Sequence, residues 1–249
     1  MAYFTIKRHL ISTLISPSHI YIYKLILGWM RMSKNILVIA AHPDDELLGL
    51  GGTLKKLIKK GYKVISVIMA LGRKEEAHHI KKFVENANKH IGIEKVICLD
   101  YPNLEMESFA LHTINKKIEA LIKEYQPSMV FTHHYGDVNR DHQVTYQAVL
   151  TAVRPLPGTP SIDLICFETV SSSEWSQQTD DKTFKPNYFV EITDEIEDKI
   201  EALHHYDVEM RDFPHPRSYD GVRYLARVRG MTVGVPYAEA FEITRKIWR

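Results

Sequence analysis

Two short segments of the sequence concentrate side chains that can bind a metal ion. The first follows an apolar run and reads His-Pro-Asp-Asp-Glu over residues 42–46, and the second, residues 133–142, holds three histidines and two aspartates. Imidazole and carboxylate groups are the usual ligands of zinc, and a hydrolytic zinc site leaves a fourth position for water. Because zinc lowers the pKa of that water from about 16 to about 7, such a site hydrolyses amides or esters at neutral pH.

Residue spacing narrows the choice of ligands. His42 and Asp45 lie three positions apart, so one turn can bring both to a single ion, and His142 can complete the set from the second segment. A carboxylate beside the bound water would take its proton, and either Asp44 or Glu46 is suitable. Each segment taken alone also fits an ordinary strand-to-helix turn in which an aspartate caps the helix. The metal site therefore depends on whether the two segments meet.

The elements that must position these segments alternate between strand and helix. Apolar runs rich in β-branched residues predict strands at residues 35–40, 64–69, 95–99, 128–132, 163–168 and 188–192. Apolar residues at helical spacing predict helices at residues 46–60, 75–91, 111–125, 142–153 and 194–206. This alternation indicates an α/β fold, with a doubly wound, mostly parallel sheet in three α/β/α layers and a C-terminal elaboration.

The expected sheet topology makes the two segments converge. In a doubly wound sheet of order 3-2-1-4-5 the first and fourth strands are neighbours, and the crevice beyond their carboxyl ends is the usual ligand site. Residues 42–46 follow the first predicted strand, and residues 133–142 follow the fourth. The two richest polar loops of the chain are therefore expected to face one crevice.

The sequence Ala-His-Pro-Asp-Asp-Glu at residues 41–46, with an Asp-His pair at residues 141–142, resembles the LmbE-like (PIG-L) family of zinc-dependent N-deacetylases. The likeness runs from about residue 35 to residue 245, and residues 237–241 are similar to the branch that contains the bacillithiol-pathway deacetylases. The resemblance implies removal of the acetyl group from an N-acetylated amino sugar or sugar conjugate of the N-acetylglucosamine type.

Site roles follow from the same resemblance, position by position. It implies one zinc per chain on His42, Asp45 and His142, and iron(II) also suits this ligand set. Asp44 would be the general base, and Asp141 would orient a neighbouring ligand. Zinc would polarise the acetamide carbonyl during attack by water, and the products would be an amine and acetate.

One catalytic position departs from the family pattern. Asn139 stands where several relatives have a histidine that steadies the oxyanion or protonates the leaving amine. An amide can donate a hydrogen bond to an oxyanion but supplies no proton. His134 is therefore the expected proton donor, with His133 and a protonated Asp44 as the alternatives.

The substrate-binding residues also depart from the pattern. Many relatives carry Arg-x-x-Glu-x-x-x-Ala, and here Ile80 and Phe83 occupy the Arg and Glu positions. The polar, proline-rich residues 213–218 are a candidate lid over the crevice, or alternatively a plain surface turn. The polar stretch at residues 171–185 is expected to be a surface excursion. The expected substrate contacts are Arg73, His215, Arg217 and Glu239.

Composition excludes several classes of protein. The net charge is +1, from 32 basic and 31 acidic residues, so nucleic acid is not an expected partner. Cys98 and Cys166 lie in apolar runs and are expected to be buried, reduced thiols, which favours the cytoplasm. The expected partner is a small molecule, and a homo-oligomer is left open.

The chain is expected to hold one domain, residues 33–249, after an N-terminal extension, residues 1–32. The apolar part of the extension is interrupted by Lys24 and is far short of a membrane span. Three interpretations stay open for it: a non-native extension, an anchor on a membrane surface, or an extra helix. Membrane contact is expected only for the second.

Other functions are compatible with the same sheet. A nucleotide-binding protein or transferase is disfavoured because the first strand-to-helix turn lacks Gly-x-Gly-x-x-Gly, and the glycines at 49, 51 and 52 fall inside the predicted helix. A metal-free binding module is a further alternative. A third is a zinc amidase that acts on a different acylated small molecule.

Overall fold

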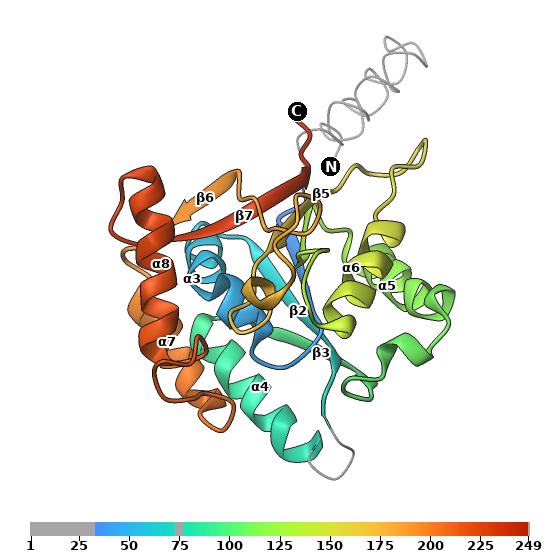
Figure 1. Ribbon diagram of the computed structural model, residues 1–249. Coiled ribbons are helices and arrows are strands. Elements are labelled where there is room, and N and C mark those ends of the chain that lie inside the picture. The colour runs from blue at the N-terminus through green and yellow to red at the C-terminus, as the bar shows by residue number, and fades with distance from the viewer. Residues whose placement is uncertain (1–32, 73–76, 249) are drawn as a thin grey trace, which may run out of the picture. The chain divides into compact units, whose positions relative to one another are not determined.

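The computed structural model describes residues 33–72 and 77–248, which are drawn in colour in Figure 1. The strands of this part are β1 (Asn35–Ala40), β2 (Lys63–Ala70), β3 (Lys95–Tyr101), β4 (Met129–His133), β5 (Asp163–Phe167), β6 (Tyr188–Glu191) and β7 (Ala238–Arg245). Its α-helices are α3 (Asp45–Lys59), α4 (Ala77–Ile91), α5 (Leu111–Tyr125), α6 (Arg140–Ala152), α7 (Ile196–Leu203) and α8 (Tyr219–Val233). Its short 3₁₀ helices are η1 (Met106–Ser108), η2 (Ser173–Trp175) and η3 (His204–Tyr206). The expected N-terminal extension and Arg73 lie outside the described residues.

The strands form one sheet in the order β3-β2-β1-β4-β5-β7-β6. β1 pairs in parallel with β2 and β4, and the β2–β3 and β4–β5 pairs are also parallel. β7 pairs antiparallel with both β5 and β6. The predicted order 3-2-1-4-5 and the doubly wound α/β class are therefore confirmed, and β6 and β7 belong to the C-terminal elaboration.

β1 lies in the middle of the sheet and is buried on both faces. Ile36 and Val38 pack into one apolar core with residues of α3, α4 and α7, whereas Leu37 and Ile39 pack into a second core with residues of α5 and α6. Figure 1 shows the same division, with α5 and α6 on one side of the sheet and α3, α4 and α7 on the other. A continuous apolar run is what a strand covered on both faces requires.

The sequence analysis does not predict α8 or β7. Among the residues of α8, only Val222, Ala226 and Gly230 are buried, so its apolar stripe is narrow. β7 is stabilised by pairing with β5 and β6, which lie far from it in the sequence. Local periodicity cannot report such pairing.

Both cysteines carry free thiols, but their burial differs. Cys166 is buried as expected, whereas Cys98 is only half-buried. Burial raises the pKa of Cys98 to about 11 and that of Cys166 to about 12. Both thiols therefore stay protonated at neutral pH and are poor nucleophiles. Separately, none of the helices in the described part of the chain has the length and apolar character needed to cross a membrane.

Candidate active site and metal centre

Three side chains from the two polar loops meet at one point. His42 Nδ1 lies 3.4 Å from Asp45 Oδ2 and 3.3 Å from His142 Nε2, and these last two atoms are 3.3 Å apart. Ligand atoms bound at about 2.0–2.1 Å to a tetrahedral zinc stand roughly 3.4 Å from one another. The three side chains, called the ligand triangle below, are therefore spaced to hold one small divalent cation. Within residues 33–72 and 77–248 no other group of histidine, cysteine or acidic residues is arranged in this way.

The turn between β1 and α3 positions two of these ligands. The backbone N–H of His42 donates to Asp45 Oδ2 over 2.8 Å, so the two residues hold each other in place. Asp44, between them, has a φ of 90°, a conformation that is strained for a residue with a side chain. With this backbone conformation, Asp44 contacts Arg217 while the next residue, Asp45, contacts His142.

The third ligand comes from the first turn of α6. Asn139 caps this helix, because its side-chain oxygen accepts a hydrogen bond from the backbone N–H of Asp141 over 2.9 Å. The cap starts α6 at Arg140, at the end of the loop that follows β4, and β4 pairs with β1. His142 is thereby placed next to His42, with 5.3 Å between the ring centroids.

Asp141 orients His42. Its Oδ2 lies 3.0 Å from His42 Nε2, so that nitrogen donates and Nδ1 is left to face the ligand triangle. Two backbone groups hold the carboxylate: the N–H of Leu104 donates over 2.7 Å and that of Met106 over 3.1 Å. Burial alone would raise the pKa of Asp141, but the hydrogen bond from His42 and these two N–H groups lower it.

Asp137 has the same relation to His142, and the sequence analysis gives it no role. Its Oδ2 lies 3.2 Å from His142 Nδ1 and also accepts a hydrogen bond from Ser173 over 2.8 Å. The hydroxyl of Ser172 donates to the other carboxylate oxygen. Despite burial, which acts to raise it, the pKa of Asp137 is lowered to about 2 by His142, Ser172 and the N–H of Asn139.

The serines beside Asp137 correct one expectation from the sequence. Residues 171–185 were expected to form a surface excursion, but Ser171, Ser172, Ser173 and Ser176 are all buried. Polar composition suggested solvent exposure, whereas the hydroxyls of Ser172, Ser173 and Ser176 are buried because they donate to the loop that carries Gly136 and Asp137. Short runs of serines are common in sequences, so this run did not indicate a contact with Asp137.

Asp44 faces the pocket above the ligand triangle and is paired with Arg217. The guanidinium donates to Asp44 Oδ2 over 3.3 Å and, through Nε, to Ser171 Oγ over 3.1 Å. Burial and the neighbouring Asp45 raise the pKa of Asp44, although Arg217 opposes this. Arg217, one of the expected substrate contacts, therefore lies in the site beside the expected base.

Glu46, the other carboxylate considered as a base, points away from the pocket. It is fully buried, and its Oε1 accepts hydrogen bonds from Asn88 over 2.8 Å and from Tyr206 over 2.9 Å. Burial raises its pKa to about 7. Because Glu46 is turned toward Asn88 and Tyr206 and does not line the pocket, Asp44 is the carboxylate that can reach a bound water.

The two adjacent histidines after β4 are occupied by other contacts. His133 Nε2 accepts the backbone N–H of Ala41 over 2.8 Å, and its ring stacks on that of His142. Burial lowers the pKa of His133 to about 3. His134 is bound on both ring nitrogens, by Glu242 at 2.8 Å and by the Lys182 carbonyl at 2.7 Å. Neither ring lines the pocket, so the structure does not bring the expected proton donor to the site.

Two further expected substrate contacts, His215 and Glu239, are not part of the pocket lining. The ring of His215 packs against Trp175, and its Nδ1 accepts the backbone N–H of Arg217 over 3.1 Å. Glu239 is buried on β7, where it accepts the backbone N–H of Thr53 over 2.7 Å and the ammonium of Lys199 over 2.7 Å. Its contacts are with α3 and α7 and not with the crevice.

The pocket itself has a volume of about 260 Å³, and the three residues of the ligand triangle are part of its lining. Asp44, Asn139, Ser171 and Arg217 contribute polar groups to its lining. The side-chain oxygen of Asn139 caps the helix, whereas its NH₂ group makes no hydrogen bond to any of the described residues. The site therefore combines a cation-binding centre, one carboxylate beside it, and a free hydrogen-bond donor.

Comparison with known proteins identifies the family. The model of the PIG-L family, described as GlcNAc-PI de-N-acetylase, matches residues 37–153. A protein of Escherichia coli described as the uncharacterized deacetylase YaiS is 31% identical over 177 residues, which are 68% of this chain and 88% of that protein. The chain therefore belongs to the PIG-L (LmbE-like) family.

Two proteins from archaea extend the similarity over most of the chain. The diacetylchitobiose deacetylase of Thermococcus kodakarensis is 26% identical over 230 residues, which are 86% of this chain and 85% of that protein. The solved structure of the N,N'-diacetylchitobiose deacetylase from Pyrococcus horikoshii, in complex with its inhibitor MPG, superposes with a TM-score of 0.70 at 26% identity. That match covers 85% of this chain and 84% of the other.

Proposed function

We propose that this protein is a metal-dependent N-deacetylase that releases acetate from an N-acetylated amino sugar or sugar conjugate. The observation that carries the proposal is the ligand triangle of His42, Asp45 and His142, with edges of 3.3–3.4 Å, in the lining of a pocket that Asp44 also lines. The sugar class is supported by the relatives, because similar proteins are named as deacetylases of acetylated sugars.

A divalent cation on these ligands, which we propose is zinc, would polarise the acetamide carbonyl and make a bound water more acidic. The carboxylate of Asp44 takes a proton from the attacking water, while Arg217 keeps the carboxylate oriented. The NH₂ group of Asn139 donates to the carbonyl oxygen as negative charge develops there.

The proton needed by the leaving amine comes from the same carboxylate. His133 accepts an N–H from Ala41 and His134 is bound to Glu242 and Lys182, so neither ring delivers a proton to the pocket. Protonated Asp44 instead gives its proton to the amide nitrogen as the C–N bond breaks. Water and amide thus become acetate and amine, and Asp44 returns to its starting state.

The test combines metal content with product release. Elemental analysis of the purified protein should find about one zinc or iron per chain, and acetate should be released from a panel of N-acetylglucosamine conjugates. His42→Ala should lose the metal. Asp44→Asn should keep the metal and lose activity by roughly 10²–10⁴-fold, the usual contribution of a general base.

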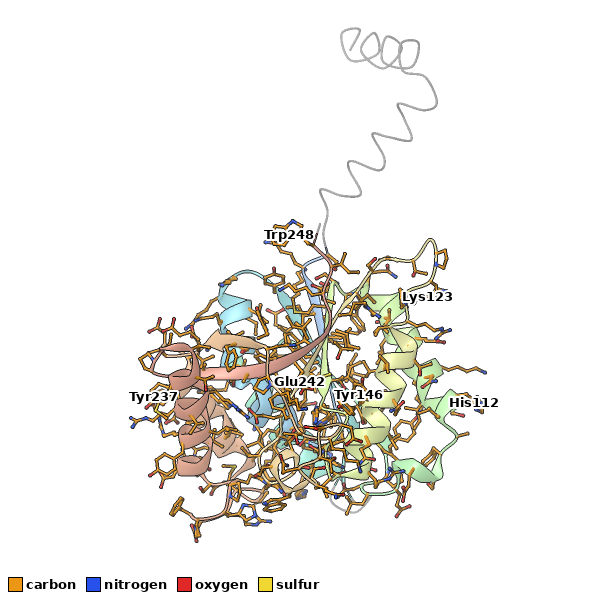
Figure 2. All side chains as sticks on the ribbon, turned by 45° about the horizontal axis from the view of Figure 1, so that its top comes forward. His112, Lys123, Tyr146, Tyr237, Glu242 and Trp248 are labelled. Carbon is orange, nitrogen blue, oxygen red and sulfur yellow. The ribbon has the colours of Figure 1, made fainter. Side chains whose placement is uncertain are left out.

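His112→Ala is the matched control for the metal measurement, because His112 is exposed on α5, at the outer edge of the molecule in Figure 2, and is not part of the ligand triangle. It should retain both the metal and the activity. A wild-type protein that binds no metal after zinc is supplied would contradict the proposal and favour a metal-free binding module. A loaded protein that cleaves only acylated compounds without a sugar would favour the broader amidase.

A further inference from the structure

We propose that the pocket recognises an apolar substituent of its substrate, an alkyl or aryl group, through four apolar side chains of its lining. These four residues, called the apolar wall below, are Ile80, Phe83, Leu104 and Val208. The inference rests on the proposed function and narrows its substrate class to amino sugars that carry such a group.

Leu104 is held at the site by its backbone while its side chain stays exposed. Its N–H donates to Asp141 over 2.7 Å, so it is fixed to the carboxylate that orients His42. Its φ is 59°, a left-handed conformation that is uncommon for leucine. Nevertheless its side chain is 68% exposed and belongs to none of the apolar cores. A strained, solvent-facing leucine next to the metal site is unfavourable unless a ligand covers it.

The rest of the apolar wall comes from two other segments. Val208, in the loop after η3, is 64% exposed and lies outside the apolar cores as well. Ile80 and Phe83 lie one turn apart on α4 and are half-buried. Three segments that are distant in the sequence thus place apolar side chains around one pocket, which is typical of a ligand-binding surface.

The pocket lining also contains a group of polar residues. Asp44, Ser171 and Arg217 form a hydrogen-bonded group within the pocket lining, and Glu209 lies 3.8 Å from Arg217. Among the described lining residues, Arg217 is already paired with the carboxylates of Asp44 and Glu209, so these residues offer little to an anionic substituent. An anion against the apolar wall would also lose hydration without gaining a partner. The pocket therefore fits a ligand with a polar amide end and an uncharged, apolar end.

An apolar group can be attached to an amino sugar in two ways, and the experiment separates them. It is either the aglycone of a glycoside or an N-acyl chain longer than acetyl. In the first arm, kcat/KM for acetate release is compared between methyl and octyl glycosides of N-acetylglucosamine. In the second arm, amine release is compared between the N-acetyl and N-octanoyl forms of the methyl glycoside. All substrates are kept below their micelle-forming concentrations.

We expect a preference of at least tenfold for the longer chain in one arm, because each buried methylene improves affinity roughly fourfold. The double variant Leu104→Asn/Val208→Thr should reduce that preference to about twofold or less. Asparagine tolerates the left-handed backbone at position 104 and keeps the N–H that binds Asp141. The informative quantity is the ratio between the long-chain and short-chain substrates within each variant.

The matched control is Met231→Asn/Val233→Thr. Both residues are exposed apolar side chains on α8, outside the pocket, so the wild-type preference should persist. Equal rates for short and long chains in wild type, or a preference that survives in the Leu104/Val208 variant, would overturn the apolar wall and leave the deacetylase function standing. A wild-type enzyme that hydrolyses none of the four compounds would overturn both proposals.

Discussion

At the scale of single residues, each histidine of the ligand triangle has its own carboxylate partner. Asp141 contacts Nε2 of His42, and Asp137 contacts Nδ1 of His142. Each ring therefore presents its other nitrogen to the centre of the ligand triangle, Nδ1 for His42 and Nε2 for His142. Fixing the tautomer and the ring orientation in this way makes the imidazole a stronger ligand.

The two carboxylate partners should therefore affect metal binding. Asp137→Asn and Asp141→Asn keep the size of the side chain but remove its charge, and each should weaken zinc affinity by about 10–100-fold. Competition with a chromogenic chelator measures the affinity, and thermal unfolding of the apoprotein checks that the fold is retained. Asp220→Asn, an exposed position on α8, is the control. Wild-type affinity in both site variants would show that these aspartates only pack the loops.

At the scale of elements, α3 consists of two helical segments with a break at Leu50, where φ is −150° and ψ is 22°. A break leaves backbone groups without helical partners. Lys199 of α7 donates to the Leu48 carbonyl over 2.8 Å, and Glu239 of β7 accepts the Gly52 N–H over 3.0 Å. These two side chains form a buried ion pair at 2.7 Å. The ion pair thus supplies hydrogen-bond partners to backbone groups on both sides of the break. It also links α3, which begins with Asp45 of the ligand triangle, to α7 and β7.

Removing one member of this pair should be costly. Lys199→Met leaves the Glu239 carboxylate buried without its cation, and we expect a loss of about 3–5 kcal/mol in the free energy of unfolding. The double variant Lys199→Met/Glu239→Gln should recover part of this loss because no charge stays buried. Urea unfolding of the three proteins gives the comparison.

Lys185→Met is the control for that series, because its ion pair with Asp180 is exposed. Its cost should be below about 1 kcal/mol. If Lys199→Met costs no more than this control, the ion pair does not stabilise the broken helix.

At the scale of the whole molecule, a buried histidine ties the parallel part of the sheet to its antiparallel elaboration. His134, directly after β4, has acceptors at both ring nitrogens: the Glu242 carboxylate of β7 and the Lys182 carbonyl. Figure 2 labels Glu242 on the long β7 strand. Burial alone would lower the pKa of His134, but the hydrogen bonds with Glu242 and Lys182 raise it. Only the protonated ring can donate to both acceptors.

This contact predicts a pH-dependent part of the stability. Because the folded-state pKa of His134 lies above its ordinary value of 6.5, the stabilisation is complete below about pH 6.5 and is lost as the pH rises through the higher folded pKa. Glu242→Gln should lower the free energy of unfolding by about 1.5 kcal/mol at pH 6 and by less at pH 9. Urea unfolding at the two pH values measures the difference.

Glu197→Gln provides the control for the pH series. Glu197 pairs with Arg223 on the surface, and arginine does not titrate in this range. Its effect should be the same at pH 6 and pH 9. A Glu242→Gln effect that is equally independent of pH would contradict a charged His134.

The sequence by itself determined the sheet and the centre of the site. β1 is predicted by a continuous apolar run because a strand covered on both faces needs one, and the alternation with helices predicts parallel pairing. His42 and Asp45 are close in the chain, so one turn brings them together. His142 joins them because the carboxyl ends of neighbouring parallel strands share one edge of the sheet.

The tertiary structure decided which of the other polar residues face the pocket. Asp44 and Glu46 are two residues apart, yet one lines the pocket and the other is buried against Asn88 and Tyr206. Their difference depends on a strained turn and on partners from distant segments, which local spacing does not report.

Three other polar residues also have contacts that their sequence positions did not predict. Asp137 orients His142 with the help of serines from another loop, Glu239 closes the break in α3, and His134 binds β7. The role of a buried polar side chain depends on the hydrogen-bond donor or acceptor that it contacts in the folded protein. When that partner lies tens of residues away, only the packed chain brings the two together.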